Sequence, residues 1–114
     1  MKKESAIVTA CCNWLALLEN SGKLVYQRNN TGAVVTREFG RKARFLRFGK
    51  KGASDILIFC PGGRTLHVEV KSDVGKMSFE QMEYEHKITA LGHTYYLIRS
   101  LDELENILKD VGAI

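Results

Sequence analysis

Two short apolar segments joined by a glycine-rich turn constrain the fold of this chain more than any other feature. Asp55 to Cys60 (DILIFC) and Thr65 to Lys71 (TLHVEVK) each have the length of a strand, and Pro61-Gly62-Gly63-Arg64 lies between them. Apolar segments of this length on either side of a glycine turn are typical of a β-hairpin. The sequence therefore predicts two neighbouring antiparallel strands here.

The length of the turn decides which side chains share a face, because side chains alternate along a strand. A tight two-residue turn at Gly62-Gly63 would place Asp55 opposite Val70. A three-residue loop, Pro61-Gly62-Gly63, would instead place Asp55 opposite Glu69. We favour the second register because it makes the other face uniformly apolar, with the residues Ile56, Ile58, Cys60, Leu66, Val68 and Val70.

In that register the polar face gathers Asp55, Glu69 and Lys71 at one end of the hairpin. Two facing carboxylates repel each other unless a positive charge lies between them. A hard divalent cation such as Mg²⁺ prefers oxygen ligands of this kind. A Glu-x-Lys pattern is also common on solvent-exposed strands without a function, so the assignment needs further residues.

The N-terminal half of the chain predicts one helix and additional strands. Apolar residues at helical spacing indicate a helix from Glu4 to Asn20, which Ser21-Gly22 would end, and Leu24 to Arg28 has the composition of a strand. Two further strand-like pieces, Val34–Thr36 and Ala43–Phe48, lie around a basic bend at Gly40-Arg41-Lys42.

The C-terminal half contains two capping boxes, which mark the starts of helices. Ser78 with Gln81 opens a helix that runs to about Leu91, and Ser100 with Glu103 opens a final helix that ends near Asp110. A short strand, Thr94 to Ile98, lies between these helices. The order α-β-β-β-α-β-α within 114 residues predicts a single α/β domain, residues 1–114, with a mixed β-sheet flanked by helices.

Two polar residues lie on apolar helix faces near the starts of their helices. Glu4 falls on the same stripe as Val8 and Leu15, and Gln81 falls on the stripe of Tyr84. Each also has a local explanation, because an acid suits a helix N-terminus and Gln81 completes a capping box. Together they suggest that both helices begin near one polar site.

The net charge of +4 is unevenly distributed along the chain. Most of the excess lies between residues 37 and 51, where Glu38 opposes the basic residues Arg37, Arg41, Lys42, Arg44, Arg47, Lys50 and Lys51. A basic segment of this kind is typical of a protein that binds a phosphate backbone. A solvated loop is the alternative.

The three cysteines and the N-terminus give no sign of secretion. Cys11, Cys12 and Cys60 are odd in number and lack Cys-x-x-Cys spacing, which argues against disulfides and a zinc site and favours buried small side chains. The longest apolar stretch, Ala6 to Leu18, is too short to span a membrane, and no signal-peptide pattern follows Met1. We expect a cytoplasmic protein.

These residues, in this order, resemble the virus-type replication–repair nuclease (VRR-NUC) family of the PD-(D/E)XK nuclease superfamily. The likeness covers residues 47–105 and rests on Gly52-Ala53-Ser54-Asp55, Val68-Glu69-Val70-Lys71, Gly75-Lys76-Met77-Ser78 and Gln81. Glu4 in the first helix is a weaker match. The family typically has proline before the aspartate, where this chain has Ser54.

The resemblance implies a PD-(D/E)XK-type core and Mg²⁺-dependent hydrolysis of phosphodiester bonds in DNA, with Mn²⁺ able to substitute. Short stand-alone members look like viral or prophage enzymes that act as homodimers on branched DNA, Holliday junctions included, whereas DNA repair nucleases carry the same module fused to other domains. A nickase, an exonuclease or a restriction-like nuclease of the same fold is an alternative. A non-catalytic nucleic-acid-binding domain is another. The resemblance also implies the cytoplasm of a bacterium or of a virus-infected host cell. No membrane partner and no small-molecule cofactor are expected.

The resemblance also suggests a role for each residue. Asp55 and Glu69 would bind the metal with the Val70 carbonyl as a third ligand, and Glu4 would bind it through water or hold a second metal. Lys71 would orient or deprotonate the attacking water, and Gln81 would hold Lys71 or that water. His67 is expected to be a structural residue with its hydrogen bonds satisfied. The candidates for contacts to the DNA backbone are Arg41, Lys42, Arg44, Arg47, Lys50 and Lys51.

Overall fold

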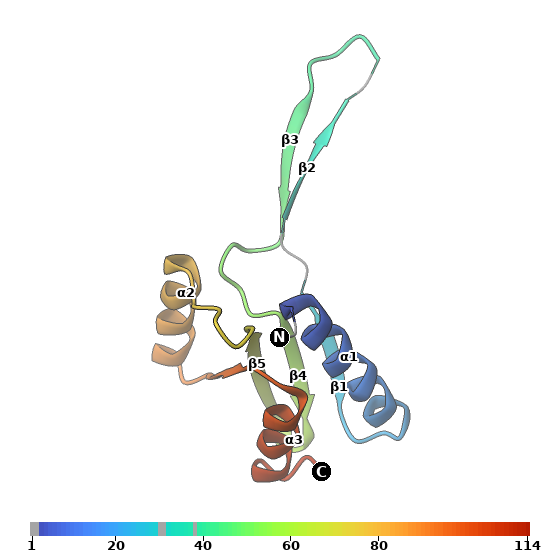
Figure 1. Ribbon diagram of the computed structural model, residues 1–114, viewed down its shortest axis with the longest axis vertical. Helices are drawn as coiled ribbons and strands as arrows, with labels where there is room; N and C mark the ends of the chain where they lie inside the picture. Colours follow the sequence, from blue (N-terminus) through green and yellow to red (C-terminus); the bar gives the residue numbers. More distant parts are fainter. Residues whose placement is uncertain (1–2, 30–31, 38) are drawn as a thin grey trace.

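The computed structural model describes residues 3–29, 32–37 and 39–114 of the chain. Figure 1 shows a main body of helices around a sheet, with a narrow hairpin that stands away from it. The elements are α1 (Glu4–Asn20), β1 (Val25–Arg28), β2 (Gly32–Thr36), β3 (Arg44–Phe48), β4 (Ile56–Cys60), a short 3₁₀ turn (Pro61–Gly63), β5 (Arg64–Val70), α2 (Phe79–Ala90), β6 (Thr94–Ile98) and α3 (Leu101–Asp110).

The main sheet has four strands in the order β1-β4-β5-β6. β4 pairs antiparallel with both β1 and β5, whereas β6 runs parallel to β5. The parallel pair is possible because α2 carries the chain back between β5 and β6. The predicted mixed sheet flanked by helices is confirmed. The two strand-like pieces predicted at Val34–Thr36 and Ala43–Phe48 form β2 and β3, which lie between β1 and β4 in the chain.

The predicted three-residue loop between β4 and β5 is confirmed. Pro61–Gly63 form the turn, with Gly62 at φ 80° and Gly63 at φ 75°, a left-handed region that glycine adopts without a steric penalty. Leu57 pairs with His67 and Phe59 with Thr65, as the favoured register requires. One further step along the same register places Asp55 opposite Glu69.

One face of the sheet forms the core. Its strand residues are fully or almost fully buried and pack with α1 and α3, through the residues Ile7, Val8, Cys11, Leu15, Ile56, Ile58, Cys60, Leu66, Val68, Val70, Leu104 and Leu108. Helix α2 lies over the other face of the sheet. His67 points to that face, since the side chain of its neighbour Val68 points into the core, and the ring of His67 contacts Tyr84 of α2. All three cysteines are free; Cys11 and Cys60 are buried in this core and Cys12 is half-buried.

The helix boundaries agree closely with the sequence. The capping box of Ser78 and Gln81 is present at α2, where each side chain bonds the other residue's backbone N–H. At α3 the hydroxyl of Ser100 accepts from Glu103 N, but the Glu103 carboxylate accepts from Arg99 N instead of completing the box. Among the described residues, no helix is long and apolar enough to cross a membrane.

The strands β2 and β3 pair only with each other, in a separate two-stranded sheet. Figure 1 shows this hairpin projecting from the end of the body where the first turn of α1 lies. Its apolar side chains are exposed on both faces of the ribbon: Val35 and Phe45 on one face, and Leu46 and Phe48 on the other. None of the hairpin side chains that the structure describes belongs to the core.

Candidate active site

Asp55 and Glu69 lie together at the end of the β4–β5 hairpin. Asp55 immediately precedes β4, and its Oδ2 accepts a hydrogen bond of 2.7 Å from the backbone N–H of Val70. Glu69 on β5 is only 1% exposed, which is unusual for a carboxylate. The register of the hairpin thus brings two acids together at one end of the two central strands, as the sequence predicted.

Burial, together with the hydrogen bond and the negative charge of Asp55, raises the pKa of Glu69 to about 9. Lys71 and the hydroxyl of Tyr95 act in the opposite direction. A carboxylate in this setting is unstable as an isolated anion, because burial removes water and the neighbouring acid repels it. The pair therefore favours either a shared proton or a bound cation.

Two side chains orient the carboxylate of Glu69. Gln81 Nε2 donates to Oε1 at 3.3 Å, and the Tyr95 hydroxyl donates to Oε2 at 3.2 Å. Gln81 does this while its Oε1 caps α2, so its capping role and its site role coexist. The Gln81 amide donates to Glu69, and the role of Gln81 in holding Lys71 or the attacking water stays a prediction.

Sequence reasoning missed Tyr95 as a site residue. It lies on β6, where it pairs with His67 in the parallel register and reaches diagonally to Glu69. Burial raises its pKa above the ordinary value, and the negative charge of Glu69 raises it further, so the hydroxyl remains a proton donor. The pairing of β6 with β5 determines this contact, and no local pattern in Thr94–Ile98 reports that pairing.

Lys71 follows β5 directly and is only 7% exposed. Its backbone N–H donates to Ile98 O at 2.9 Å, which fixes the start of the next loop. Its Nζ lies 4.0 Å from Glu4 Oε1, at the loose limit of an ion pair. Glu4, in the first turn of α1, is thus brought to the site beside the amine of Lys71.

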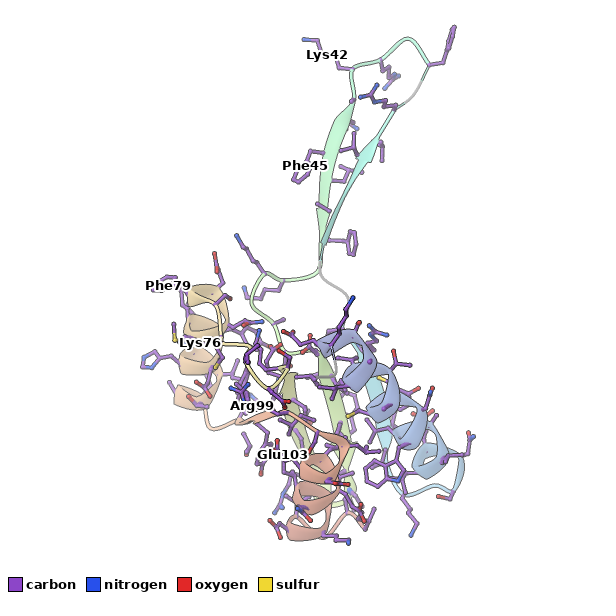
Figure 2. The ribbon with its side chains drawn as sticks, in the orientation of Figure 1. Lys42, Phe45, Lys76, Phe79, Arg99 and Glu103 are labelled. Atoms are coloured by element: carbon purple, nitrogen blue, oxygen red, sulfur yellow. The ribbon has the colours of Figure 1, made fainter. Side chains whose placement is uncertain are left out.

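The loop after Lys71 is held close to Glu4. The Arg99 guanidinium donates to the carbonyls of Ser72 and Gly75, and Figure 2 shows Arg99 beside this loop. A Cβ at Gly75 would lie 3.2 Å from Glu4 Oε2, so only glycine fits here without displacing that carboxylate. Arg99 is a second residue that the sequence did not reveal, because its carbonyl partners carry no side-chain signature.

The donors present fit a hard divalent cation. No cluster of three or more His, Cys, Asp or Glu side chains is found within residues 3–29, 32–37 and 39–114. Mg²⁺, however, is commonly held by one or two carboxylates and several waters. Asp55 and Glu69 supply two carboxylates, and the Val70 carbonyl points to the same side of β5 as the N–H that bonds Asp55. Glu4, near Lys71, is available to a bound water.

The predicted basic residues lie along the projecting hairpin and its exit loop, away from the carboxylates. Arg41 and Lys42 lie in the bend, Arg44 begins β3, and Lys50 and Lys51 follow β3; all five are exposed. The side chain of Arg47 lies outside the described part of the structure. Lys51 pairs with Glu80 of α2 at 3.2 Å and lines, with Lys50 and Tyr84, a hollow of about 210 Å³.

Both ends of the hairpin are fastened to the site. On the entry side, Asn29 donates from its backbone N–H to Asp55 O at 2.8 Å and from its side chain to Ser54 O at 3.0 Å. On the exit side, Gly52 has φ +86°, and a Cβ there would lie 2.3 Å from the carbonyl oxygen of Glu80. The backbone around Asp55 and the start of α2 thus anchor the base of the hairpin.

Two buried polar atoms near the site have no hydrogen-bond partner among the described residues, Ser54 Oγ and His67 Nδ1. The prediction that the hydrogen bonds of His67 are satisfied is therefore wrong for Nδ1. Burial lowers the pKa of His67, and the neighbouring His93, whose ring lies 5.5 Å away, lowers it further. His67 packs between the rings of Tyr84 and His93, which agrees with a structural role.

Neither a family model nor a curated protein matches this sequence. A solved structure described as a "VRR_NUC domain" is similar, with a TM-score of 0.61 over 95% of this chain and 97% of that chain. The chain has the VRR_NUC fold. At 17% identity the likeness shows the fold alone. For the fold, it confirms the resemblance predicted from the sequence motifs. Within the VRR_NUC fold of this chain, the acids converge where β4, β5 and the start of α2 meet.

Proposed function

We propose that this protein is a divalent-metal-dependent nuclease that hydrolyses phosphodiester bonds in DNA. One observation carries the proposal: Glu69 is buried against Asp55, with the buried amine of Lys71 two residues further along the same chain segment. This arrangement has little value for folding, because buried charges destabilise a protein unless they are well paired. It is the arrangement expected of a site for a cation and a phosphate.

Phosphodiester hydrolysis requires a positioned water, neutralisation of charge on the phosphate oxygens, and help for the leaving oxygen. Mg²⁺ or Mn²⁺, when bound, would supply positive charge and acidify a water. Asp55, Glu69 and the Val70 carbonyl would hold the cation. Lys71 would orient the attacking water and contact the scissile phosphate through its Nζ.

The surrounding residues would keep this arrangement in place. Gln81 and Tyr95 each donate a hydrogen bond to a different oxygen of Glu69, so the carboxylate is fixed in orientation. Glu4 would anchor the amine of Lys71 or a water on the cation. Oriented donors of this kind are how second-layer residues tune metal ligands.

The finer proposal is that the substrate is branched DNA, with Holliday junctions the preferred case, and that the enzyme acts as a homodimer in the manner of viral or prophage resolving enzymes in the cytoplasm. Paired cuts at a four-way junction need two sites, which a dimer supplies. The fold likeness and the basic hairpin support a nucleic-acid substrate. The preference for branches and the dimer come from the family resemblance.

The test is a cleavage assay on a four-way junction, a linear duplex of the same sequence and a single strand, each with Mg²⁺, Mn²⁺ or EDTA. We expect cleavage with either metal, none with EDTA, and a preference for the junction. Equal cutting of the linear duplex would favour the nickase, exonuclease or restriction-like alternatives. Binding without cleavage under any metal would favour the non-catalytic domain and would refute the enzyme.

A matched pair of lysine variants tests the site itself. Lys71→Ala should lower the cleavage rate by at least about 100-fold, the usual loss on removing a group that stabilises transition-state charge, while junction binding persists. Lys23→Ala, an exposed lysine between α1 and β1, should cleave like the wild type. Cleavage by Lys71→Ala at the wild-type rate would show that the chemistry occurs elsewhere. Analytical ultracentrifugation gives the subunit count independently.

A further inference from the structure

We propose that the β2–β3 hairpin is a stacking surface for unpaired DNA bases, with Phe39 in its bend as the contact that recognises them. This inference rests on the proposed nucleic-acid substrate and names the feature of that substrate that the hairpin would read. Three observations carry it: exposed aromatic rings, positive charge between them, and the attachment of the hairpin to the site.

The hairpin exposes aromatic rings to solvent. Phe39, next to Gly40 in the bend, is fully exposed, and Phe45 and Phe48 on β3 are 61% and 46% exposed. Figure 2 shows Phe45 extending sideways from the ribbon, far from the body of the protein. None of these three rings belongs to the hydrophobic core, so packing of the main body does not account for them.

The hairpin also carries the net charge of the protein. Residues 32–48 contain five basic residues and one acid, a balance of +4, and the other positions contain twelve of each, a balance of zero. Lys42 in the bend and Arg44 at the start of β3 lie between Phe39 and Phe45 in the sequence. Aromatic rings interleaved with basic side chains are the composition that binds single-stranded nucleic acid, by stacking on bases and pairing with phosphates.

The position of the hairpin connects this surface to the site. Asn29 ties its entry to the backbone of Ser54 and Asp55, and Gly52 packs its exit against α2. DNA held along the hairpin would therefore reach the protein at the end of the sheet where Asp55 and Glu69 lie. Unpaired or unstacked bases occur where strands branch, so stacking on Phe39 would select branch points over regular duplex.

The positive charge of the hairpin favours nucleic acid over a second copy of this chain as the partner that binds it. An interface formed by two copies of the hairpin would bring together two surfaces of +4 each, whereas a phosphate backbone is complementary to both. The rings alone would suit either occupant. The charge balance therefore favours nucleic acid as the partner that covers them.

The test compares Phe39→Ala with Phe79→Ala, since both remove an exposed ring and Phe79 on α2 is 72% exposed outside the hairpin. Binding is measured in EDTA, so that it does not depend on cleavage. One DNA is a branched junction with unpaired bases carrying 2-aminopurine at the branch, and the other is a fully paired linear duplex of equal length. Sedimentation of each variant is measured alongside.

We expect Phe39→Ala to weaken junction binding by about 5- to 100-fold, the range for loss of one base–aromatic stack, and to change linear-duplex binding by less than about 2-fold. Quenching of 2-aminopurine by the wild type should be lost in Phe39→Ala and kept in Phe79→Ala. Equal losses on both DNAs, or no loss on either, would overturn the proposal. Conversion of a dimer to a monomer by Phe39→Ala would also overturn it, by assigning the surface to a second copy.

These outcomes are separable from the proposed function. A protein that binds junctions through Phe39 but cleaves nothing would retain this inference and lose the enzyme. A protein that cleaves junctions, and whose Phe39→Ala variant binds them as tightly as the wild type does, would retain the enzyme and lose this inference.

Discussion

The molecule contains two β-hairpins of similar size with opposite surroundings. The β4–β5 hairpin lies in the middle of a four-stranded sheet, and every residue on its apolar face is buried. The β2–β3 hairpin pairs with no other described strand, exposes apolar side chains on both faces, and carries the exposed basic residues Lys42 and Arg44. Local pattern alone makes both segments strands, so the difference between them is one of tertiary context.

Because of that difference, we propose different roles for the two hairpins. A buried hairpin holds side chains in fixed positions, which a carboxylate pair such as Asp55 and Glu69 requires. An exposed hairpin cannot fix its side chains to the same degree, but it can present charge and rings to a large partner. We therefore assign chemistry to the inner hairpin and substrate contact to the outer one.

The largest expected effect comes from truncating one leucine in each hairpin. Leu66 on β5 is fully buried and Leu46 on β3 is 46% exposed. Leu66→Ala should reduce the free energy of unfolding by about 2–5 kcal/mol, because it leaves a cavity in the core. Leu46→Ala should change it by no more than about 0.5 kcal/mol. Urea unfolding measures both, and comparable losses would mean that the outer hairpin is packed against something in solution.

Much of the inner hairpin could be predicted from the sequence. Alternation of apolar and polar residues, together with the three-residue loop, gave the register that sets Asp55 opposite Glu69. The capping box of Ser78 and Gln81 gave the start of α2. These features are local, or depend on a turn whose length can be read directly, so the sequence contains them in full.

Contacts between distant segments could not be predicted in the same way. Tyr95 reaches Glu69 only because β6 pairs parallel to β5, and Asn29 reaches Asp55 only because β1 pairs with β4. Strand order depends on packing of the whole domain and leaves no spacing signal. The outer hairpin was ambiguous for a related reason: both its faces carry apolar and basic residues, so it lacks the alternation that marks a half-buried strand.

Removing charge from the outer hairpin should weaken DNA binding without slowing the chemistry. For Lys42→Ala with Arg44→Ala, both exposed, we expect about 10- to 100-fold weaker binding near 0.1 M salt and a smaller salt dependence, because fewer counterions are released. The cleavage rate at saturating DNA should be unchanged. Titrations at several salt concentrations measure the slope. The control removes two exposed lysines elsewhere, Lys23 and Lys109, and an equal loss there would indicate nonspecific attraction.

A smaller effect should come from neutralising the buried acid of the inner hairpin. In the metal-free protein the pKa of Glu69 is raised to about 9, so the wild type loses stability as pH rises from the ordinary carboxyl range towards 9. Glu69→Gln should therefore melt higher than the wild type in EDTA at pH 8, by roughly 1 kcal/mol or about 4–8 °C, and differ less at pH 5.

Melting measured with added Mg²⁺ tests whether Glu69 is a metal ligand. It should raise the melting temperature of the wild type at pH 8 and leave Glu69→Gln nearly unchanged, because one of its two carboxylate ligands is gone. Glu83→Gln, half-exposed on α2 and paired with Lys87, is the matched control and should respond to Mg²⁺ like the wild type. An equal response from Glu69→Gln would exclude Glu69 as a ligand.

The smallest effect concerns Ser54, which joins the exit loop of the outer hairpin to the inner one. Its side chain is fully buried, and its Oγ has no hydrogen-bond partner among the described residues, whereas its carbonyl is bonded by Asn29. Because an unpaired buried hydroxyl destabilises the native state, Ser54→Ala should stabilise the protein by up to about 1 kcal/mol. The backbone contact to Asn29 is retained, so cleavage should be unaffected. Destabilisation by Ser54→Ala in urea unfolding would instead mean that the hydroxyl is bonded in solution, and that the junction between the two hairpins depends on it.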